Sequence, residues 1–197
     1  LPVAVHATER ITAQLAVQAG ADLLVHGVED EPIDEPFVSL LKQKGTVLSP
    51  TLVVAGNYLK TFAQDYRPTT EDFRYAHPTP LASLYNLPAA TDTALVRQYQ
   101  AYAVRNRAAA MQEDSLRQAN LKRLAKGGVT IATGTDAGNI GTQHVSSYFD
   151  ELAAMQQSGM SGWDLLQAST INGAKAVGKS GEFGAVKRGL RADLLLL

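Results

Sequence analysis

The sequence predicts an α/β fold built on a parallel sheet. Three short apolar runs carry this prediction, because a buried parallel strand reads as a continuous apolar segment. His6 ends the first run, His26 ends the second, and Asp136 follows the third. Over the first fifty residues, segments with helical spacing and short loops separate the apolar runs, which is the alternation of strands and helices that a parallel sheet requires.

The first fifty residues give the alternation in order. The expected elements are a strand at 3–6, a helix from Thr8 to Gly20, a strand at 23–26, a helix from Asp34 to Gly45 and a strand at 46–52. Thr8 and Asp34 are residue types that cap the start of a helix. Glycine is the type that most often ends one.

Residues 55–91 break this alternation. They contain four prolines, a histidine and several tyrosines, namely Pro68, Pro78, Pro80, Pro88, His77, Tyr58, Tyr66, Tyr75 and Tyr85. We expect an irregular excursion with short helical pieces, of the kind that carries substrate contacts. The tyrosines either line a pocket or anchor the packing. His77 is expected to be structural or to face solvent.

The remaining elements resume the alternation. They are a helix at 92–126, a strand at 129–133, a glycine-rich loop at 137–144, helices at 147–157 and 162–177, a turn at 184–189 and a strand at 192–197.

Composition excludes several classes of function. The net charge of −1 comes with no basic stripe, so nucleic acid is not an expected partner. No run of about 18 apolar residues is present, so no membrane-spanning segment is expected. The chain has no cysteine, which excludes disulfides and thiolate chemistry and leaves the compartment open. Neither a phosphate-binding loop nor a serine nucleophile motif is found.

The ends of the apolar runs are the candidate site. Carboxyl ends of parallel strands share one edge, so His6 and His26 should lie side by side, with Asp136 at the same edge. Two imidazoles and a carboxylate suit a divalent metal such as zinc. Asp136 is also placed to accept a proton from water. The alternatives are a pair of histidines satisfied within the core and an aspartate that stabilises its own turn.

His144 lies in the loop after Asp136. It either contacts the substrate or its leaving group, or it faces water, and the sequence leaves both readings open.

Six strings together resemble the metal-dependent amidohydrolase superfamily, in its imidazolonepropionase and Xaa-Pro dipeptidase branch. They are Val3–Ala7, Leu24–Gly27, Ser49–Leu52, Thr133–His144, Ala168–Ala174 and Gly189–Leu194. The resemblance implies a (β/α)8 barrel of TIM type with a small β-sandwich. It places His6 at the end of strand five, His26 at the end of strand six and Asp136 at the end of strand eight. In this family the two histidines hold one metal, and the aspartate touches the other and shuttles the proton.

The resemblance covers only the second half of such a barrel. The family's strand-one His-x-His pair and its strand-four bridging lysine are absent from this chain. We therefore expect the C-terminal part of a longer protein, containing strands five to eight and a C-terminal sandwich strand. Residues 1–180 would form the partial barrel, with the insertion at about 55–91, and residues 181–197 would begin the return to the sandwich.

The expected function is hydrolysis of carbon–nitrogen bonds in an amide, a peptide or a cyclic amide by a metal-activated water. The cofactor would be one or two divalent ions, with zinc as the leading candidate, and the substrate a small molecule or dipeptide. The open edges of a half barrel favour pairing with another chain, including a homo-oligomer. The alternatives are a truncated or degenerate scaffold that acts as an interaction module, and a deaminase or phosphotriesterase relative.

Overall fold

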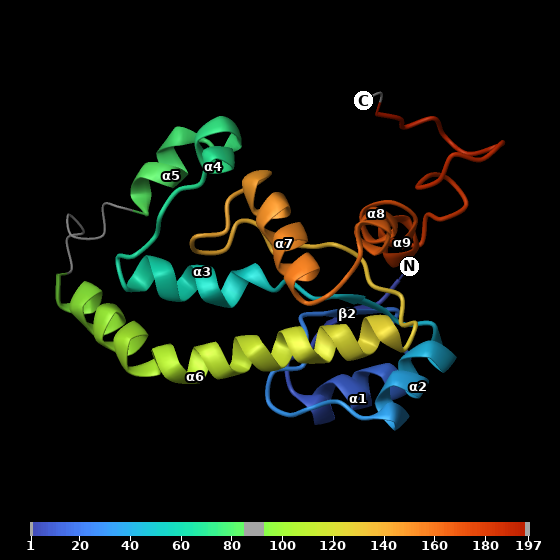
Figure 1. Cartoon of the computed structure of the whole chain (residues 1–197), viewed down its shortest axis with the longest axis horizontal. Helices are drawn as coiled ribbons and strands as arrows, with labels where there is room; N and C mark the ends of the chain where they lie inside the picture. Colours follow the sequence, from blue (N-terminus) through green and yellow to red (C-terminus); the bar gives the residue numbers. More distant parts are fainter. Residues whose placement is uncertain (1, 85–92, 196–197) are drawn as a thin grey trace. The chain divides into compact units, whose positions relative to one another are not determined.

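The computed structural model describes residues 2–84 and 93–195 (Figure 1). The chain divides into two compact units. The first unit comprises residues 1–50, 116–133 and 155–197, and the second comprises residues 51–115 and 134–154. The long helix α6 (Thr93–Lys126) contributes its first part to the second unit and its last part to the first unit. Each unit is described by itself.

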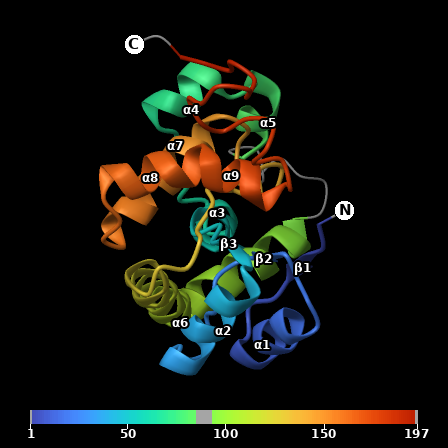
Figure 2. The ribbon, with the colours of Figure 1, turned by 90° about the vertical axis from the view of Figure 1, so that its right-hand side faces the viewer.

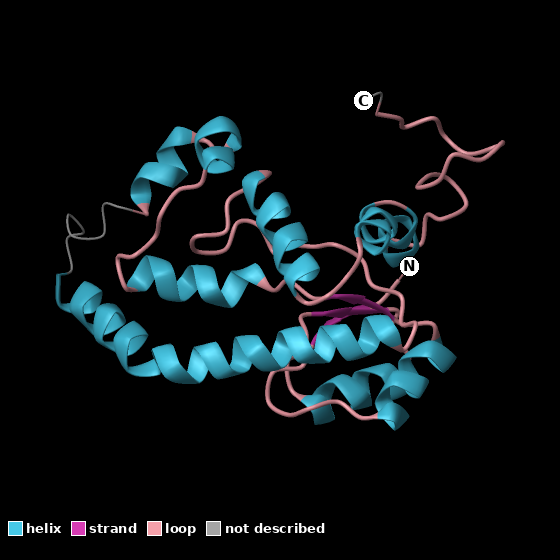
Figure 3. Ribbon diagram, in the orientation of Figure 1, coloured by secondary structure: helices cyan, strands magenta, loops and turns pink. Residues whose placement is uncertain are grey.

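A three-stranded parallel sheet forms the centre of the first unit (Figure 3). Its strands β1 (Ala4–His6), β2 (Leu23–Val25) and β3 (Val47–Ser49) lie in the order β1-β2-β3. In the register of the sheet, Leu24 of β2 lies opposite Val5 of β1 and Leu48 of β3. The parallel α/β arrangement predicted from the apolar runs is therefore confirmed.

The strand expected at 129–133 is reduced to a single parallel bridge beside β3. The Leu48 N–H donates to the Thr130 carbonyl at 2.9 Å, and the Ala132 N–H donates to the Leu48 carbonyl at 2.8 Å. The next amide, that of Thr133, donates to the Ala168 carbonyl at 3.1 Å. The chain leaves the sheet at this point, because the Thr133 amide bonds to the helix that contains Ala168 and no longer to a strand.

Helices α1 (Arg10–Gln18) and α2 (Glu35–Lys44) follow the first two strands. The α2 boundaries agree with the sequence, since Asp34 accepts the Phe37 N–H at 3.0 Å and Gly45 ends the helix at a φ of 70°. The predicted start of α1 was wrong by one residue. Glu9 precedes the helix without a side-chain cap, because the Thr8 carbonyl accepts the Glu29 N–H at 2.9 Å and holds that residue outside the helix.

The expected helix at 162–177 is two helices, α8 (Gly162–Ser169) and α9 (Ile171–Ala176). Thr170 interrupts them with a non-helical backbone, at φ −125° and ψ −94°. In both views α8 and α9 lie on the opposite side of the strands from α1 and α2 (Figures 1 and 2). The sheet of the first unit is thus covered on both faces, as expected for parallel strands.

Asn120 of α6 holds the irregular segment between β2 and α2. It is 4% exposed. Its side-chain oxygen accepts the Ile33 N–H at 3.0 Å, and its amide nitrogen donates to the carbonyls of Val28 and Glu31, both at 3.0 Å. One side chain therefore satisfies three backbone groups, of which those of Ile33 and Val28 are buried.

Changing Asn120 to Ala is expected to lower the free energy of unfolding by about 3 kcal/mol, because buried backbone groups then lose their partners. Urea unfolding measures this loss. Asn106→Ala is the matched control on the same helix, because Asn106 is only partly buried and its side chain donates to the Tyr102 carbonyl in a solvent-exposed hydrogen bond. The control should change stability by about 0.5 kcal/mol or less. Equal losses in the two variants would contradict the role given to Asn120.

The second unit is helical in its described part. It contains α3 (Val53–Phe62), α4 (Thr70–Tyr75), α5 (Pro78–Ser83), the first part of α6 and α7 (Ser146–Gln157) up to residue 154. Tyr66, Leu81 and Leu84 form a buried cluster, and the Tyr66 hydroxyl donates to Asp72 at 2.9 Å. The short helical pieces expected in the excursion are confirmed. Tyr85, Pro88 and the predicted helix start at residue 92 lie outside the described residues.

The segment after residue 190 forms no strand in its described part, residues 191–195. Residues 196 and 197, which complete the expected strand, lie outside the described residues. The sandwich strand therefore stays a prediction. Across the described residues, no helix combines the length and the apolarity needed to cross a bilayer.

Candidate functional site

Two histidines meet at the carboxyl edge of the sheet in the first unit. His6 is the last residue of β1, and His26 directly follows β2, where its N–H donates to the Ser49 carbonyl at 2.9 Å. The centroids of the two imidazole rings lie 4.4 Å apart, with the ring planes at 75°. The parallel register thus brings together two side chains that are twenty residues apart, as the strand order predicts. Their role as metal ligands stays a prediction.

The backbone is strained at two of the three predicted ligands. The backbone angle φ is 77° at His26 and 55° at Asp136, and residues other than glycine rarely adopt these values. Such conformations cost free energy and concentrate at functional sites. Three more described residues share them, Thr51, Gln64 and Val145, so strain supports a function here without identifying it.

The first unit offers two candidate ligands for a divalent metal. Adjacent imidazoles are a donor set suited to zinc and related ions. Within residues 2–84 and 93–195, no group of three or more His, Cys, Asp or Glu side chains is arranged to hold a metal. Asp136 belongs to the second unit, so its place as a further ligand is a proposal.

In the second unit, α3 holds the loop that follows Asp136. The Tyr58 hydroxyl donates to Asn139 at 2.6 Å, and the Asn57 amide donates to the Thr142 hydroxyl at 3.4 Å. Gly141 packs so tightly that a Cβ placed there would lie 2.8 Å from the Asn57 carbonyl oxygen. The loop conformation therefore depends on the surface of α3.

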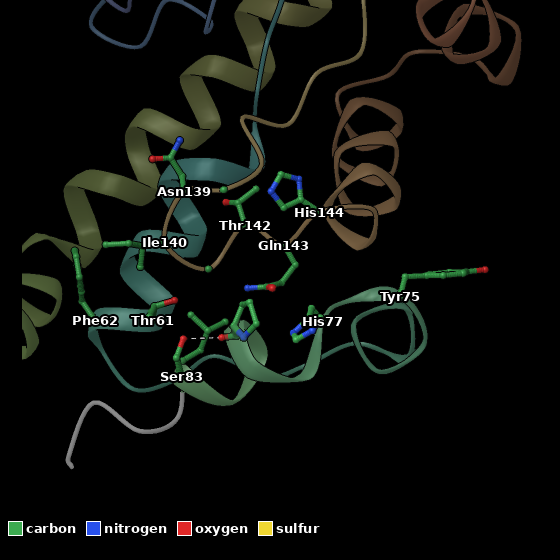
Figure 4. Close-up of a pocket in the computed structure, with 14 residues that line it drawn as sticks. Thr61, Phe62, Tyr75, His77, Ser83, Asn139, Ile140, Thr142, Gln143 and His144 are labelled. Atoms are coloured by element: carbon green, nitrogen blue, oxygen red, sulfur yellow. Dashed lines mark hydrogen bonds between the residues drawn. The ribbon is translucent and has the colours of Figure 1, made fainter. Parts of the chain in front are cut away.

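The same loop and the excursion enclose a pocket of about 610 Å³ (Figure 4). His144 from the loop and His77 from the start of α5 both line it, and Gln143 lies between the two rings in this view. His144 lines this pocket and is also exposed, so contact of His144 with a substrate stays a prediction. His77 has the expected structural role, because its Nδ1 accepts the Thr79 N–H at 3.3 Å, and it also lines the pocket. Tyr75 lines the pocket too, whereas Tyr66 is buried in the cluster with Leu81.

Glu151 of α7 is a buried carboxyl that sequence reasoning missed. It is 0% exposed, and its two oxygens accept the N–H groups of Leu52 and Val53 at 3.0 and 3.1 Å, at the start of α3. Burial raises the pKa of the Glu151 carboxyl from 4.5 to about 7, although the two backbone donors act in the opposite direction. Glu151 lies four residues from Ser147 and from Met155, and both of these are also buried, so the three residues share one face of α7. Ser147 and Glu151 are polar residue types, so the sequence did not indicate this burial.

The raised pKa of Glu151 makes stability depend on pH. Between pH 4.5 and 7 the folded state binds more protons at this group than the unfolded state does, so stability falls as pH rises through the folded pKa. In Glu151→Gln the group no longer titrates. We expect the free energy of unfolding of the unaltered chain to fall by roughly 3 kcal/mol more than that of the variant across this range.

Urea unfolding at a series of pH values measures the difference. Glu113→Gln, which changes an exposed glutamate on α6, is the matched control and should keep the original pH dependence. A Glu151→Gln variant with an unchanged pH dependence would contradict the role given to the buried carboxyl.

Comparison with known proteins assigns the family. The model of the amidohydrolase family matches residues 1–197, and the chain therefore belongs to this family of hydrolases, whose members generally use divalent metals. The imidazolonepropionase of Syntrophobacter fumaroxidans is 38% identical over 82 residues, which are 41% of this chain and 19% of that protein. The 5-methylthioadenosine/S-adenosylhomocysteine deaminase of Acetivibrio thermocellus is 33% identical over 88 residues, which are 40% of this chain and 20% of that protein.

The structural likeness is to amidohydrolase TIM-barrel proteins. The crystal structure of a Xaa-Pro dipeptidase with methionine bound in its active site matches 98% of this chain with a TM-score of 0.62 and 22% sequence identity. The match covers 37% of the dipeptidase chain. The α/β fold is therefore similar to these proteins over part of their length.

Proposed function

We propose that this chain belongs to an enzyme that hydrolyses carbon–nitrogen bonds, with His6 and His26 as ligands of a divalent metal and Asp136 as ligand and proton acceptor. The observation that carries the proposal is the contact between two imidazoles at neighbouring strand ends, in a chain of the amidohydrolase family. Zinc is the leading candidate, because imidazole nitrogen and carboxylate oxygen both suit it.

The chain's own residues supply the remaining chemistry. A divalent metal, when bound, polarises a carbonyl and makes water a better nucleophile at neutral pH. His6 and His26 lie at the ends of neighbouring strands, and this position would orient one imidazole nitrogen of each toward the metal. The Asp136 carboxylate takes the proton from the attacking water as its oxygen bonds to the carbonyl carbon. Asp136 then returns that proton to the nitrogen as the carbon–nitrogen bond breaks.

We further propose that β1, β2, β3 and the segment at 129–133 correspond to strands five to eight of a TIM-type barrel, and that the tail after residue 180 leads to a small β-sandwich. The match to 37% of the dipeptidase chain supports a partial barrel. The His-x-His pair and bridging lysine of the family are absent from this sequence, so a second ion would need ligands from elsewhere in a longer protein. The domain boundaries and a homo-oligomer stay predictions.

The substrate candidates are dipeptides, including Xaa-Pro, N-acyl amino acids and cyclic amides. The similarity to an imidazolonepropionase supports a cyclic amide, and the fold shared with a dipeptidase is compatible with a peptide. Hydrolytic deamination is a second candidate, supported by 33% identity to a deaminase over 88 residues.

A substrate panel tests the proposal. The protein is loaded with zinc and incubated with a prolyl dipeptide, an N-acyl amino acid, an imidazolone and an aminopurine nucleoside. Release of an amino acid or opening of the ring supports amide hydrolysis, and release of ammonia alone supports deamination. A protein that holds stoichiometric zinc at His6 and His26 but cleaves none of the four contradicts the proposal. A protein that neither binds zinc nor cleaves any substrate fits the scaffold alternative.

A further inference from the structure

The described residues that line the pocket in the second unit combine apolar side chains with polar ones. Phe62, Pro80, Leu84 and Ile140 contribute the apolar surface. Among the residues that the structure describes, no Asp, Glu, Lys or Arg lines it. A volume of about 610 Å³ lies within the range of small-molecule sites. A charged group placed against these walls would lose its hydration without gaining a partner, which is costly.

Two side chains that line the pocket, His77 and Thr61, have hydrogen-bonding capacity that no printed contact uses in the described part of the chain. The Nδ1 of His77 accepts the Thr79 N–H, so its ring proton lies on Nε2, which remains a donor. Thr61 is 2% exposed, and its hydroxyl has no hydrogen-bond partner in the described part of the chain. Thr61 lines the pocket together with Gln143 (Figure 4). An unpaired buried hydroxyl is unfavourable, and an oxygen of a ligand would satisfy it.

We propose that this pocket selects substrates by binding an uncharged, apolar side chain of aromatic or branched aliphatic size, next to a carbonyl oxygen that accepts from His77 and Thr61. The inference rests on the proposed function in treating the bound group as part of an amide substrate. It names the substrate class as neutral acyl amino acid derivatives with apolar side chains. Derivatives with a lysine-like cation are excluded by the uncharged walls.

The four histidines of the chain allow a direct test. His6 and His26 lie in the first unit, and His77 and His144 lie in the pocket of the second. The imidazole C–H signals in a ¹H–¹³C NMR spectrum are assigned with single His→Asn variants. The metal-free protein is then titrated with N-acetyl-L-phenylalaninamide, with N-acetyl-L-lysinamide as the charged comparison. We expect the first probe to shift the signals of His77 and His144 and the second to shift neither.

Two variants and a control sharpen the test. Ile140→Ser removes apolar wall and should weaken binding of N-acetyl-L-phenylalaninamide about tenfold. His77→Asn keeps an N-cap acceptor for α5 but removes the ring donor, and should weaken binding about three- to tenfold. Val104→Ser changes a residue of α6 that is 72% exposed and outside the pocket lining, so it should leave binding unchanged.

Three results would overturn the inference: no shift at His77 and His144, equal binding of the two probes, or unaltered binding by Ile140→Ser. A separate titration with zinc should shift His6 and His26 instead. Because the probe titration uses metal-free protein, absence of the zinc response would count against the proposed function and leave the pocket result standing. A zinc response without a probe response would overturn the pocket inference and leave the proposed function standing.

Discussion

Changing Asp136 to Asn is expected to lower kcat for hydrolysis by about 10²- to 10⁴-fold, the range that loss of a general acid–base group produces. Asparagine keeps the size of the side chain and tolerates the left-handed backbone observed at this position, with its φ of 55°. The fold of the loop should therefore survive, and only the capacity to take up a proton should be lost. Steady-state kinetics with the substrate identified by the panel measure the effect.

The control for Asp136→Asn is Asp65→Asn. Asp65 is an exposed carboxylate of the second unit that pairs with Arg107 at 3.0 Å on the surface. This variant should leave kcat unchanged, because a surface ion pair contributes little. Near-normal turnover by the Asp136→Asn protein, with its metal retained, would rule out the proton-transfer role.

Changing His6 or His26 to Asn is expected to weaken zinc binding by more than about 100-fold. Loss of a group that only hydrogen-bonds to a metal ligand already weakens binding by up to about 100-fold, and loss of a ligand itself should cost more. The reason is that each imidazole is proposed to donate directly to the metal. Asparagine also fits the left-handed backbone of His26, at a φ of 77°, so the strand end should keep its shape. Competition with a chromophoric zinc chelator measures the affinity.

His77→Asn and His144→Asn are the matched controls for the zinc measurement. Both remove an imidazole from the second unit, whereas the proposed histidine ligands belong to the first, so neither should alter zinc affinity. Zinc affinity that falls equally in all four variants would show that the ion binds histidines without selection. Unchanged affinity in the His6 and His26 variants would contradict the metal assignment.

The parts of the fold that follow local chemistry could be predicted from the sequence. Asp34 and Gly45 bound α2 as their residue types require, and the apolar runs around Val5, Leu24 and Leu48 form the parallel sheet. Thr170 was not recognised as a break, because threonine is also compatible with a helix and its unusual backbone depends on tertiary packing. The strand at 129–133 was overestimated because the bond from Thr133 to Ala168 leaves no local trace.

The candidate site divides in the same way. The contact of His6 with His26 follows from strand order, so the sequence alone could place it. The pairing of Glu151 with Leu52 joins residues 99 positions apart, and no local pattern in the sequence indicates it. The pocket around His77 and His144 combines the excursion with a distant loop, and no spacing in the sequence indicates that contact.

The most direct test of the central claim is anomalous diffraction at the zinc absorption edge, from crystals of the zinc-loaded protein. We expect a peak bonded to imidazole nitrogens of His6 and His26 at about 2.0–2.1 Å, with the Asp136 carboxylate as a further ligand. A peak bound only at His77 and His144, or no peak in protein that carries stoichiometric zinc, would contradict it.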